Sequence, residues 1–323
     1  MSEIKQKLTV SASPHFRSRQ TTSGIMLDVI IALVPSLVAA YILFGVRTLL
    51  LSAVSVAACV IFEYLSRRIM KRHNTISDLS AVVTGLLLAF NVPATMPVWM
   101  VIIGDFFAIV IAKQFFGGIG QNFVNPALIG RIVLMSSFPS KMGSFPEPLV
   151  TTVPLTGATP LSSLKSGVNP EQSLLGMFLG LRGGCLGEVC IAALLIGFVY
   201  LLVRKVISWH IPVAYIGTVA VIMLIAGKGN FEFMLYELMA GGLVLGAVFM
   251  ATDYTTSPIS KSGKIIYAVG CGIITSLIRI FGNLPEGVSF SIIIMNILVP
   301  HIEHITTPKP FGTPKNKKEE KAK

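Results

Sequence analysis

The feature that most constrains this chain is a series of long apolar runs that recur from near the N-terminus to residue 302. Several of them reach the roughly 17 to 25 residues that a helix needs to cross a bilayer. The runs are continuously apolar and do not alternate with a period of two, which is typical of helices and not of a transmembrane barrel. The expected segments are 25–44, 46–65, 76–90, 97–112, 124–137, 184–203, 209–226, 232–251, 264–281 and 288–302. We therefore predict an all-α integral membrane protein with about ten transmembrane helices.

Composition supports this class. Of the 323 residues, 53% are hydrophobic and only 13% are charged, whereas a soluble domain carries about a quarter charged residues. A net charge of +11 would suggest nucleic acid as the partner of a soluble protein. Here the charges gather at the ends of apolar segments, so we expect the lipid bilayer as the surroundings and no nucleic acid. The polar N-terminus lacks the apolar core and cleavage site of a signal peptide.

The distribution of basic residues predicts the orientation. With ten segments and the N-terminus inside, 19 of the 26 lysines and arginines fall on the cytoplasmic side and five fall in outer loops. This bias is typical of multi-pass proteins of the inner or plasma membrane, and it places both termini in the cytoplasm. The expected parts are a cytoplasmic lead (1–24), a first five-helix repeat (25–137), an outer loop (138–181), a second five-helix repeat (182–303) and a cytoplasmic tail (304–323).

Two local matches indicate that the halves are repeats. Thr84-Gly85-Leu86 and Leu245-Gly246-Ala247 are each followed by a proline 12 residues after the glycine, and Phe-Gly pairs precede the fifth and tenth segments. Five segments is an odd number, so the second repeat would be inverted relative to the first. Inverted repeats place ligand sites at their interface beside broken helices. The expected breaks are at Asn91–Pro93 and at Asn125-Pro126, and chance resemblance of two apolar halves is the alternative.

Carboxylates inside the apolar segments are candidates for ion transport, because a charged group in lipid costs about 3 kcal/mol or more. Asp105 lies in mid-segment and either belongs to a cation or proton path or pairs with a buried base, Arg131 or Arg279. Asp28 and Asp253 are further candidates for such a path, with Asp78 weighted lower. Glu188, Glu237 and Asp253 lie near segment ends, where an interfacial position is expected.

Metal chemistry by this chain alone is not expected. The four cysteines (Cys59, Cys185, Cys190 and Cys271) form no CxxC pair and no cluster with histidine. An iron–sulfur cluster shared with another subunit stays open. His301 and His304 are three residues apart near the inner surface and are either a ligand pair or interfacial side chains.

The outer loop contains Leu155-Thr156-Gly157-Ala158-Thr159-Pro160. Small residues before the second threonine would leave its hydroxyl accessible to a modifying enzyme, although such a string is also an ordinary turn.

Other short motifs flank the membrane segments. They are Ser13-Pro14-His15, Thr21-Thr22, Gly117-Gly118, the run from Asn122 to Ala127, Met250-Ala251-Thr252-Asp253 and Thr256-Ser257-Pro258. Over nearly its whole length, the chain resembles the family that includes the D subunits of Rnf complexes, the ion-translocating ferredoxin:NAD oxidoreductases, and the B subunits of sodium-pumping NADH:quinone oxidoreductases.

This resemblance implies that Thr159 carries FMN covalently through a phosphoester. Thr156, Gly157 and Ala158 complete the attachment motif, and Val153 stands where the pattern often has an aspartate. The resemblance further implies a fold related to urea transporters, a flavin transferase during maturation and, as partners, the A, B, C, E and G subunits of the Rnf complex. Lys165 and Arg182 in the outer loop either pair with the FMN phosphodiester or are solvated.

Asn122, Asn125 and Pro126 follow a glycine-rich stretch and indicate a re-entrant break with backbone groups aimed at a polar object. A second, non-covalent flavin such as riboflavin, or a coupling ion, is one interpretation, and a plain turn is the other. Thr252, Asp253 and Thr255 at the matching break in the second half allow the same two interpretations.

The expected function is that of an electron-transfer subunit coupled to Na⁺ or H⁺ transport. The chain has no nucleotide-binding βαβ unit and no ferredoxin-like cysteine run, so it would not catalyse the overall reaction alone. The alternatives are a small-solute channel of the urea-transporter type without a cofactor, or a scaffold.

Overall fold

Helices and the loops that join them make up the computed structural model, which describes residues 20–149, 160–165, 172–282 and 287–308. The first half contains α1 (Thr22–Phe44), α2 (Val46–Ile69), η1 (Ile76–Asp78), α3 (Ser80–Phe90), α4 (Val98–Phe106), η2 (Phe107–Gln114) and α5 (Pro126–Ser137). Three short helices follow: α6 (Pro139–Met142), α7 (Pro160–Lys165) and α8 (Leu174–Leu179). The second half contains α9 (Ile191–Val203), α10 (His210–Ala226), α11 (Phe231–Met239), α12 (Leu243–Leu245), η3 (Gly246–Met250), α13 (Lys261–Phe281) and α14 (Val288–Thr306). No β-sheet forms among the described residues, and the all-helical prediction is confirmed.

Four helices are long and apolar enough to cross a bilayer by themselves: α1, α2, α13 and α14. A fifth span results if α11 and the α12–η3 run, which are bent by 65° at their junction, are taken together. Each of the ten expected segments contains a helix, but α3, α5, α9 and α10 are shorter. The multi-pass membrane class is therefore confirmed, while the number ten stays a prediction.

One predicted boundary is wrong. The sixth segment was expected to start at residue 184, but α9 begins at Ile191. The preceding chain lies against the end of α3, where the Leu186 amide donates to the Val92 carbonyl (3.0 Å) and the Gly187 amide donates to the Phe90 carbonyl (2.9 Å). A Cβ atom at Gly187 would clash with the Phe90 ring, so glycine permits this close approach. These hydrogen bonds provide partners for the backbone carbonyls of Phe90 and Val92, where the third segment breaks.

The eighth segment is also broken, at a place that no sequence signal predicted. α11 ends at Met239, Ala240 is extended, and Gly241 has a φ of 66°. The Arg279 side chain from α13 donates to the carbonyls of Glu237 (2.5 Å) and Ala240 (3.0 Å). A buried helix end needs such partners because no water is available to it. The two breaks expected from sequence are present, since α3 ends at Phe90 and Asn125 caps α5.

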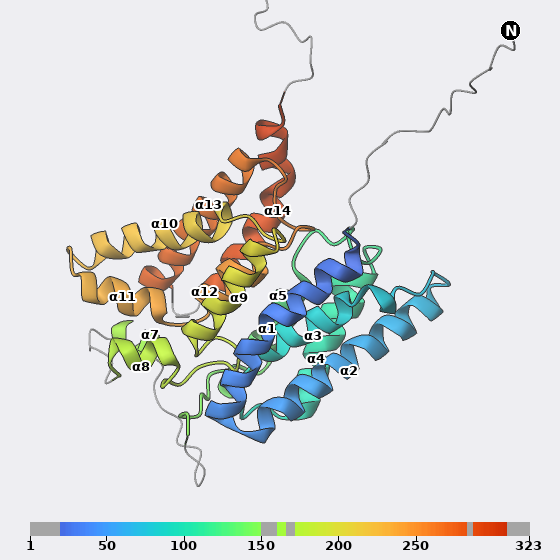
Figure 1. Cartoon of the computed structure of the whole chain (residues 1–323), viewed down its shortest axis with the longest axis horizontal. Coiled ribbons are helices and arrows are strands. Elements are labelled where there is room, and N and C mark those ends of the chain that lie inside the picture. Colours follow the sequence, from blue (N-terminus) through green and yellow to red (C-terminus); the bar gives the residue numbers. More distant parts are fainter. Residues whose placement is uncertain (1–19, 150–159, 166–171, 283–286, 309–323) are drawn as a thin grey trace, which may run out of the picture.

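The helices pack as two groups that meet along α1 and α9 (Figure 1). In the first group α2 packs on α3 and α4, and in the second group α10 packs on α11 and α13. α5 also contacts α14 across the two groups. The largest core cluster draws residues from both halves, among them Leu33, Phe90, Tyr215 and Phe249. Both described ends of the chain lie toward the same side of the molecule (Figure 1).

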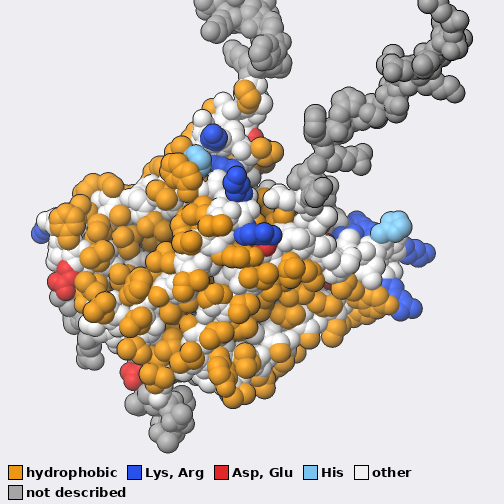
Figure 2. Space-filling view, in the orientation of Figure 1, with side chains coloured by type: hydrophobic (Ala, Val, Ile, Leu, Met, Phe, Trp, Pro, Cys, Tyr) orange, Lys and Arg blue, Asp and Glu red, His pale blue; other side chains and the backbone are white. Residues whose placement is uncertain are grey.

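The outer surface suits a lipid environment. Figure 2 shows apolar side chains spread over this face, with most of the visible lysines and arginines gathered toward its upper and right-hand edges. Exposed apolar residues occur on long helices from both halves, including Ile42 (64%), Ile61 (54%), Val221 (59%) and Ile225 (73%). Such a surface would be unfavourable in water and is expected next to acyl chains.

The closest approach between the two groups provides a stability test. Gly197 in α9 lies against the backbone of Ala32 in α1, and a Cβ atom there would clash with the Ala32 carbonyl oxygen. Small residues allow helices in membranes to pack this closely. We expect Gly197→Ala to lower the free energy of unfolding by about 1–3 kcal/mol. The measurement is the thermal unfolding midpoint of the purified protein in detergent.

Gly217→Ala is the matched control, because Gly217 is a glycine in α10 with nothing within 4 Å of the added Cβ. This change removes a flexible helix residue, so it should be neutral or stabilising by about 0.5–1 kcal/mol. Equal midpoints for the two variants would contradict the close α1–α9 packing.

Candidate functional site

Two loops from opposite halves meet at the centre of the molecule: 115–125 before α5, and 251–260 after η3. The Asn122 side-chain amide donates to the Thr255 hydroxyl (3.3 Å), and the Asn125 side-chain amide donates to the Met250 carbonyl (3.3 Å). Asn125 also caps α5 by accepting from the Ala127 amide (3.1 Å). The structure therefore brings together the two breaks that the sequence marked separately.

The glycines before α5 shape the first loop. Gly117, Gly118 and Gly120 have φ values of 126°, 102° and 84°, a region that side chains other than glycine rarely adopt. A Cβ atom at Gly118 would clash with the Arg67 guanidinium, which donates to the Gly117 carbonyl (3.1 Å). The glycine run thus lets the chain turn back over α2 and enter α5 with Asn122 and Asn125 facing the second half.

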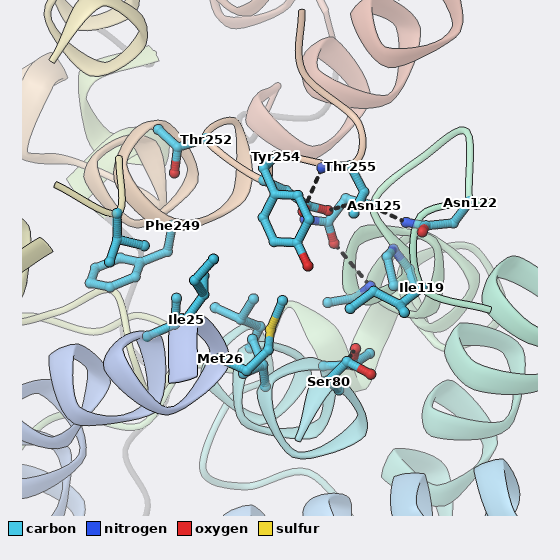
Figure 3. A pocket seen from close by; sticks show the side chains of 18 of the residues that line it. Ile25, Met26, Ser80, Ile119, Asn122, Asn125, Phe249, Thr252, Tyr254 and Thr255 are labelled. Carbon is cyan, nitrogen blue, oxygen red and sulfur yellow. Dashed lines mark hydrogen bonds between the residues drawn. The ribbon is translucent and has the colours of Figure 1, made fainter. Parts of the chain in front are cut away.

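A cavity of about 760 Å³, measured to its open mouth, lies beside this junction (Figure 3). Most of the wall is apolar, and it comes from α1, α3, α9 and η3. The lining residues are Ile25, Met26, Val29, Ser80, Val83, Thr84, Leu87, Lys113, Ile119, Asn122, Asn125, Pro126, Ala127, Leu201, Val206, Ile207, Phe249, Thr252, Asp253, Tyr254 and Thr255.

The two loops supply most of the polar groups of this cavity, which we call the interhelix pocket. The Asp253 carboxylate accepts from the amide (3.2 Å) and the hydroxyl (3.0 Å) of Thr255, which fixes the loop and leaves Thr255 able to accept from Asn122. Burial raises the pKa of the Tyr254 phenol to about 12, with a further contribution from the charge of Asp253. The Tyr254 hydroxyl therefore stays protonated and available as a donor. This pattern of apolar walls and a few converging polar groups is typical of a ligand site.

A buried ion pair lies beside the pocket, and its lysine lines the wall. The Lys113 ammonium donates to the Glu63 carboxylate (2.7 Å) and to the Ser80 hydroxyl (2.6 Å), and both charged side chains are almost fully buried. Glu63 accepts a further hydrogen bond from Thr75 (2.7 Å). Lys113 lies on η2, a π-helical stretch, and such stretches are frequent at functional sites.

Sequence reasoning missed Glu63, although it lies inside the expected segment 46–65. The criterion that selected Asp105, an acid within an apolar run, would have found it. Its partner Lys113 was assigned to a cytoplasmic loop, whereas the structure extends the fourth helical segment through Gln114.

Asp105 is fully buried and has no basic partner among the described residues. One carboxylate oxygen accepts from the Ser55 hydroxyl (2.7 Å) and the Cys59 thiol (3.3 Å), and the other oxygen has no hydrogen-bond partner. The interpretation that Asp105 pairs with Arg131 or Arg279 is therefore wrong.

Both arginines instead pair with acids that were expected at the membrane interface. Arg131 lies 3.9 Å from the Glu188 carboxylate, and Arg279 donates to the Glu237 carboxylate (3.1 Å). Glu188 and Glu237 are 2% and 6% exposed, so both are paired inside the protein, and their depth in the membrane stays a prediction. The physical reason is that each acid lies beside a helix break that turns it inward. Arg131 also donates to the Asn91 side chain at the end of α3.

The remaining acidic candidates lie elsewhere. Asp28 in α1 accepts from Arg204 (3.2 Å) and Tyr200 (2.9 Å), and so ties α1 to α9. Asp78 accepts from the Ser80 amide (2.8 Å) at the start of α3. Of the three candidates for an ion path, only Asp253 lines the interhelix pocket.

Of the outer-loop candidates, the structure describes Lys165 and Arg182. Thr156, Gly157, Ala158 and Thr159 lie outside the described residues. Arg182 is buried and donates to the carbonyls of Glu188 (2.7 Å) and Gly241 (3.4 Å), whereas Lys165 is exposed and donates to the Gly282 carbonyl.

Metal ligands do not cluster in the part of the chain that the structure describes. No group of three or more histidine, cysteine, aspartate or glutamate side chains could hold an ion there. Cys59, Cys185 and Cys271 are buried and Cys190 is partly buried, all as free thiols. Cys185 and Cys190 lie before the start of α9.

Comparison with known proteins agrees with this architecture. Residues 9–312 match the model of the NQR2, RnfD, RnfE family. The chain is 48% identical to the D subunit of a Na⁺-translocating ferredoxin:NAD⁺ oxidoreductase complex of Acetobacterium woodii, with 98% of each chain covered. It is 42% identical to the D subunit of a proton-translocating ferredoxin:NAD⁺ oxidoreductase complex of Clostridium ljungdahlii (96% and 98% covered). It is 33% identical to the D subunit of an ion-translocating oxidoreductase complex of Escherichia coli (94% and 98% covered). The chain therefore belongs to the NQR2, RnfD, RnfE family.

Proposed function

We propose that this chain is a membrane electron-transfer component of an ion-translocating ferredoxin:NAD oxidoreductase complex. The observation that carries the proposal is the similarity to the D subunit of such a complex over 98% of both chains. The name of the relative at 48% identity specifies Na⁺ translocation, and that of the relative at 42% identity specifies proton translocation. The proposal therefore keeps both Na⁺ and H⁺ as the coupling ion. Ferredoxin oxidation and NAD reduction would require the partner subunits of the complex, which are the A, B, C, E and G subunits.

Thr159 is the proposed attachment point of FMN, through a phosphoester that a flavin transferase forms during maturation. The support is the Thr156-Gly157-Ala158-Thr159 motif in a chain of this family. When bound, FMN supplies one- and two-electron transfer. The flanks of the motif favour an outer location. The Leu149 amide donates to the Leu43 carbonyl (2.9 Å) at the end of α1 that is remote from the chain terminus.

The basic residues favour the same orientation, with both termini in the cytoplasm. Arg67, Arg68, Lys71 and Arg72 lie at the end of α2, and Arg204 and Lys205 lie at the end of α9. Figure 2 shows that basic side chains are sparse along the lower part of this face. An excess of lysine and arginine on one side is typical of the cytoplasmic side.

The interhelix pocket is the proposed site of a second, non-covalent flavin such as riboflavin. The residues present fit an aromatic ring system with polar edges. Apolar side chains such as Met26 and Phe249 would exclude water from its faces, while the Asn122 side-chain oxygen and the Tyr254 hydroxyl offer hydrogen bonds at its edges. The Lys113 ammonium, paired with Glu63, lines the site.

We further propose that the two halves are inverted repeats related to urea transporters. α1 and α9, the first helix of each half, pack against each other, and α2 and α10 each pack on helical segments that follow them in their own half. The channel alternative lacks a comparable observation, because the family match points to redox complexes.

For ion coupling we favour Asp105 over Asp28. Asp28 has an arginine partner, whereas Asp105 has a carboxylate oxygen without a hydrogen-bond partner and lies next to the π-helical η2. A buried carboxylate without a basic partner is a candidate for binding a proton or a cation.

The first test concerns Thr159. Protein produced together with its flavin transferase should give a band that fluoresces under ultraviolet light on a denaturing gel, and an intact mass raised by one FMN less water. Thr159→Ala should abolish both, because the acceptor hydroxyl is gone. Thr152→Ala, in the same loop but outside the motif, should retain both. Unmodified mass in the unaltered protein would overturn the assignment.

The second test concerns the interhelix pocket and uses the Thr159→Ala background, so that any flavin released by acid is non-covalent. We expect Asn122→Leu to weaken flavin binding by about tenfold, which corresponds to the loss of one hydrogen bond in a buried site. The control is Asn74→Leu, an exposed asparagine outside the pocket. Flavin content that is unchanged by Asn122→Leu would argue against this pocket.

The third test concerns Asp105 in the assembled complex, reconstituted in vesicles. Asp105→Asn removes the charge at nearly constant volume and should reduce ion uptake per electron transferred while ferredoxin-dependent NAD reduction continues. Asp28→Asn should leave the ratio unchanged. A normal ratio in correctly assembled Asp105→Asn complex would exclude Asp105 from the ion path.

A further inference from the structure

A second cavity, of about 510 Å³, adjoins the interhelix pocket near the starts of α10 and α13. Val206, Ile207, Thr252 and Tyr254 lie between the two cavities and line both of them. The full lining is Val206, Ile207, Ser208, Ile211, Thr252, Tyr254, Ser257, Pro258, Ile259 and Lys264. We call this cavity the lysine groove, because of the charges around it.

Three lysines lie in or beside the groove. Lys264 lines it, and Lys205 and Lys261 lie one and two residues away in sequence from the lining residues Val206 and Ile259. None of the three forms an ion pair among the described residues.

The acids on the neighbouring elements offset these charges only in part, because Asp253 and Glu303 stand against three lysines and Asp28 is paired with an arginine. Asp28 pairs with Arg204, and Asp253 accepts hydrogen bonds from Thr255. Glu303 accepts from the Ile259 amide (3.1 Å). The helices α10 and α13 both begin here, so their N-terminal dipoles add to the attraction for an anion.

Aromatic and aliphatic side chains place the groove at the depth of lipid headgroups. Trp209 is 57% exposed and stacks on His210 at 4.4 Å, directly between the lining residues Ser208 and Ile211. Exposed tryptophan is enriched at the boundary between acyl chains and water. On the rim Ile259 is 83% exposed, and Val213 is 53% exposed one helical turn beyond Trp209. The charged end of the groove thus continues into an apolar surface.

We propose that the lysine groove binds the headgroup of an anionic phospholipid, with Lys264 against the phosphate and Ile259 and Val213 against an acyl chain. Basic pockets between helices on the cytoplasmic side suit such headgroups. Free phosphate would match the lysines but would leave the exposed apolar rim without a partner. This inference does not depend on any flavin in the neighbouring pocket.

The test uses tryptophan fluorescence, because the chain has only two tryptophans, Trp99 and Trp209. Full-length Trp99→Phe protein is reconstituted in phosphatidylcholine vesicles that contain a small fraction of phosphatidylglycerol with brominated acyl chains. Bromine quenches a tryptophan in contact with it, so a bound anionic lipid should quench Trp209 more strongly than the same fraction of brominated phosphatidylcholine. We expect Lys264→Gln to weaken the binding of phosphatidylglycerol about fivefold, and Lys264→Gln with Lys205→Gln about 25-fold.

Two controls separate a specific site from general surface charge. Trp209→Phe protein retains Trp99 at the start of α4, where quenching should be the same for both brominated lipids. Lys71→Gln removes an exposed lysine at the end of α2, on the same predicted side of the membrane but away from the groove, and should change nothing.

Excess inorganic phosphate should leave the quenching of Trp209 intact. Three results would overturn the proposal: equal quenching of Trp209 by both lipids, an equal loss of binding with Lys71→Gln, or displacement of the lipid by inorganic phosphate. The last result would identify a site for free phosphate instead.

Discussion

The structure depends on satisfying backbone groups where helices break inside an apolar interior. In lipid no water replaces a lost helical hydrogen bond, so side chains or other backbone groups must do so. The Arg279 side chain donates hydrogen bonds to the carbonyls at the end of α11, and the Arg182 side chain donates to the carbonyls of Glu188 and Gly241. The end of α3 pairs with the amides of Leu186 and Gly187. Burying an arginine without an acidic partner has a high free-energy cost, and here Glu237 pairs with Arg279 and Glu188 pairs with Arg131.

The same breaks create the space for a ligand. An unbroken helix pair would fill the centre with side chains, whereas two loops leave a cavity whose rim carries amides and hydroxyls. Asn125 links the two halves, because its side chain caps α5 and also donates a hydrogen bond to the Met250 carbonyl. The loop after η3 contributes to both the interhelix pocket and the lysine groove through Thr252 and Tyr254. A cofactor pocket and a lipid site would thus be separated by a single loop.

Sequence reasoning selected five polar residues of the interhelix pocket but did not predict that they line one cavity. Asn122, Asn125, Thr252, Asp253 and Thr255 were all selected from broken or repeated patterns, and all five line one cavity. The pairing of Glu188 and Glu237 with Arg131 and Arg279 was not predicted, because each partner lies in a different helical segment. Glu63 and Lys113 were overlooked as a pair, since each alone looks like an isolated charge near a helix end. The attachment motif at Thr159 lies outside the described residues and stays a prediction.

The sequence by itself determined the class of the protein. Continuous apolar runs can only be buried as helices in lipid, and basic residues at their ends predict the orientation, because both properties are local along the chain. The resemblance to the family likewise follows from short motifs. Only the tertiary structure decided which charges pair and which breaks meet. Arg279 and Glu237 are 42 residues apart, and Asn122 and Thr255 are 133 residues apart. Such contacts depend on how helices pack in three dimensions, and no periodicity in a single segment encodes them.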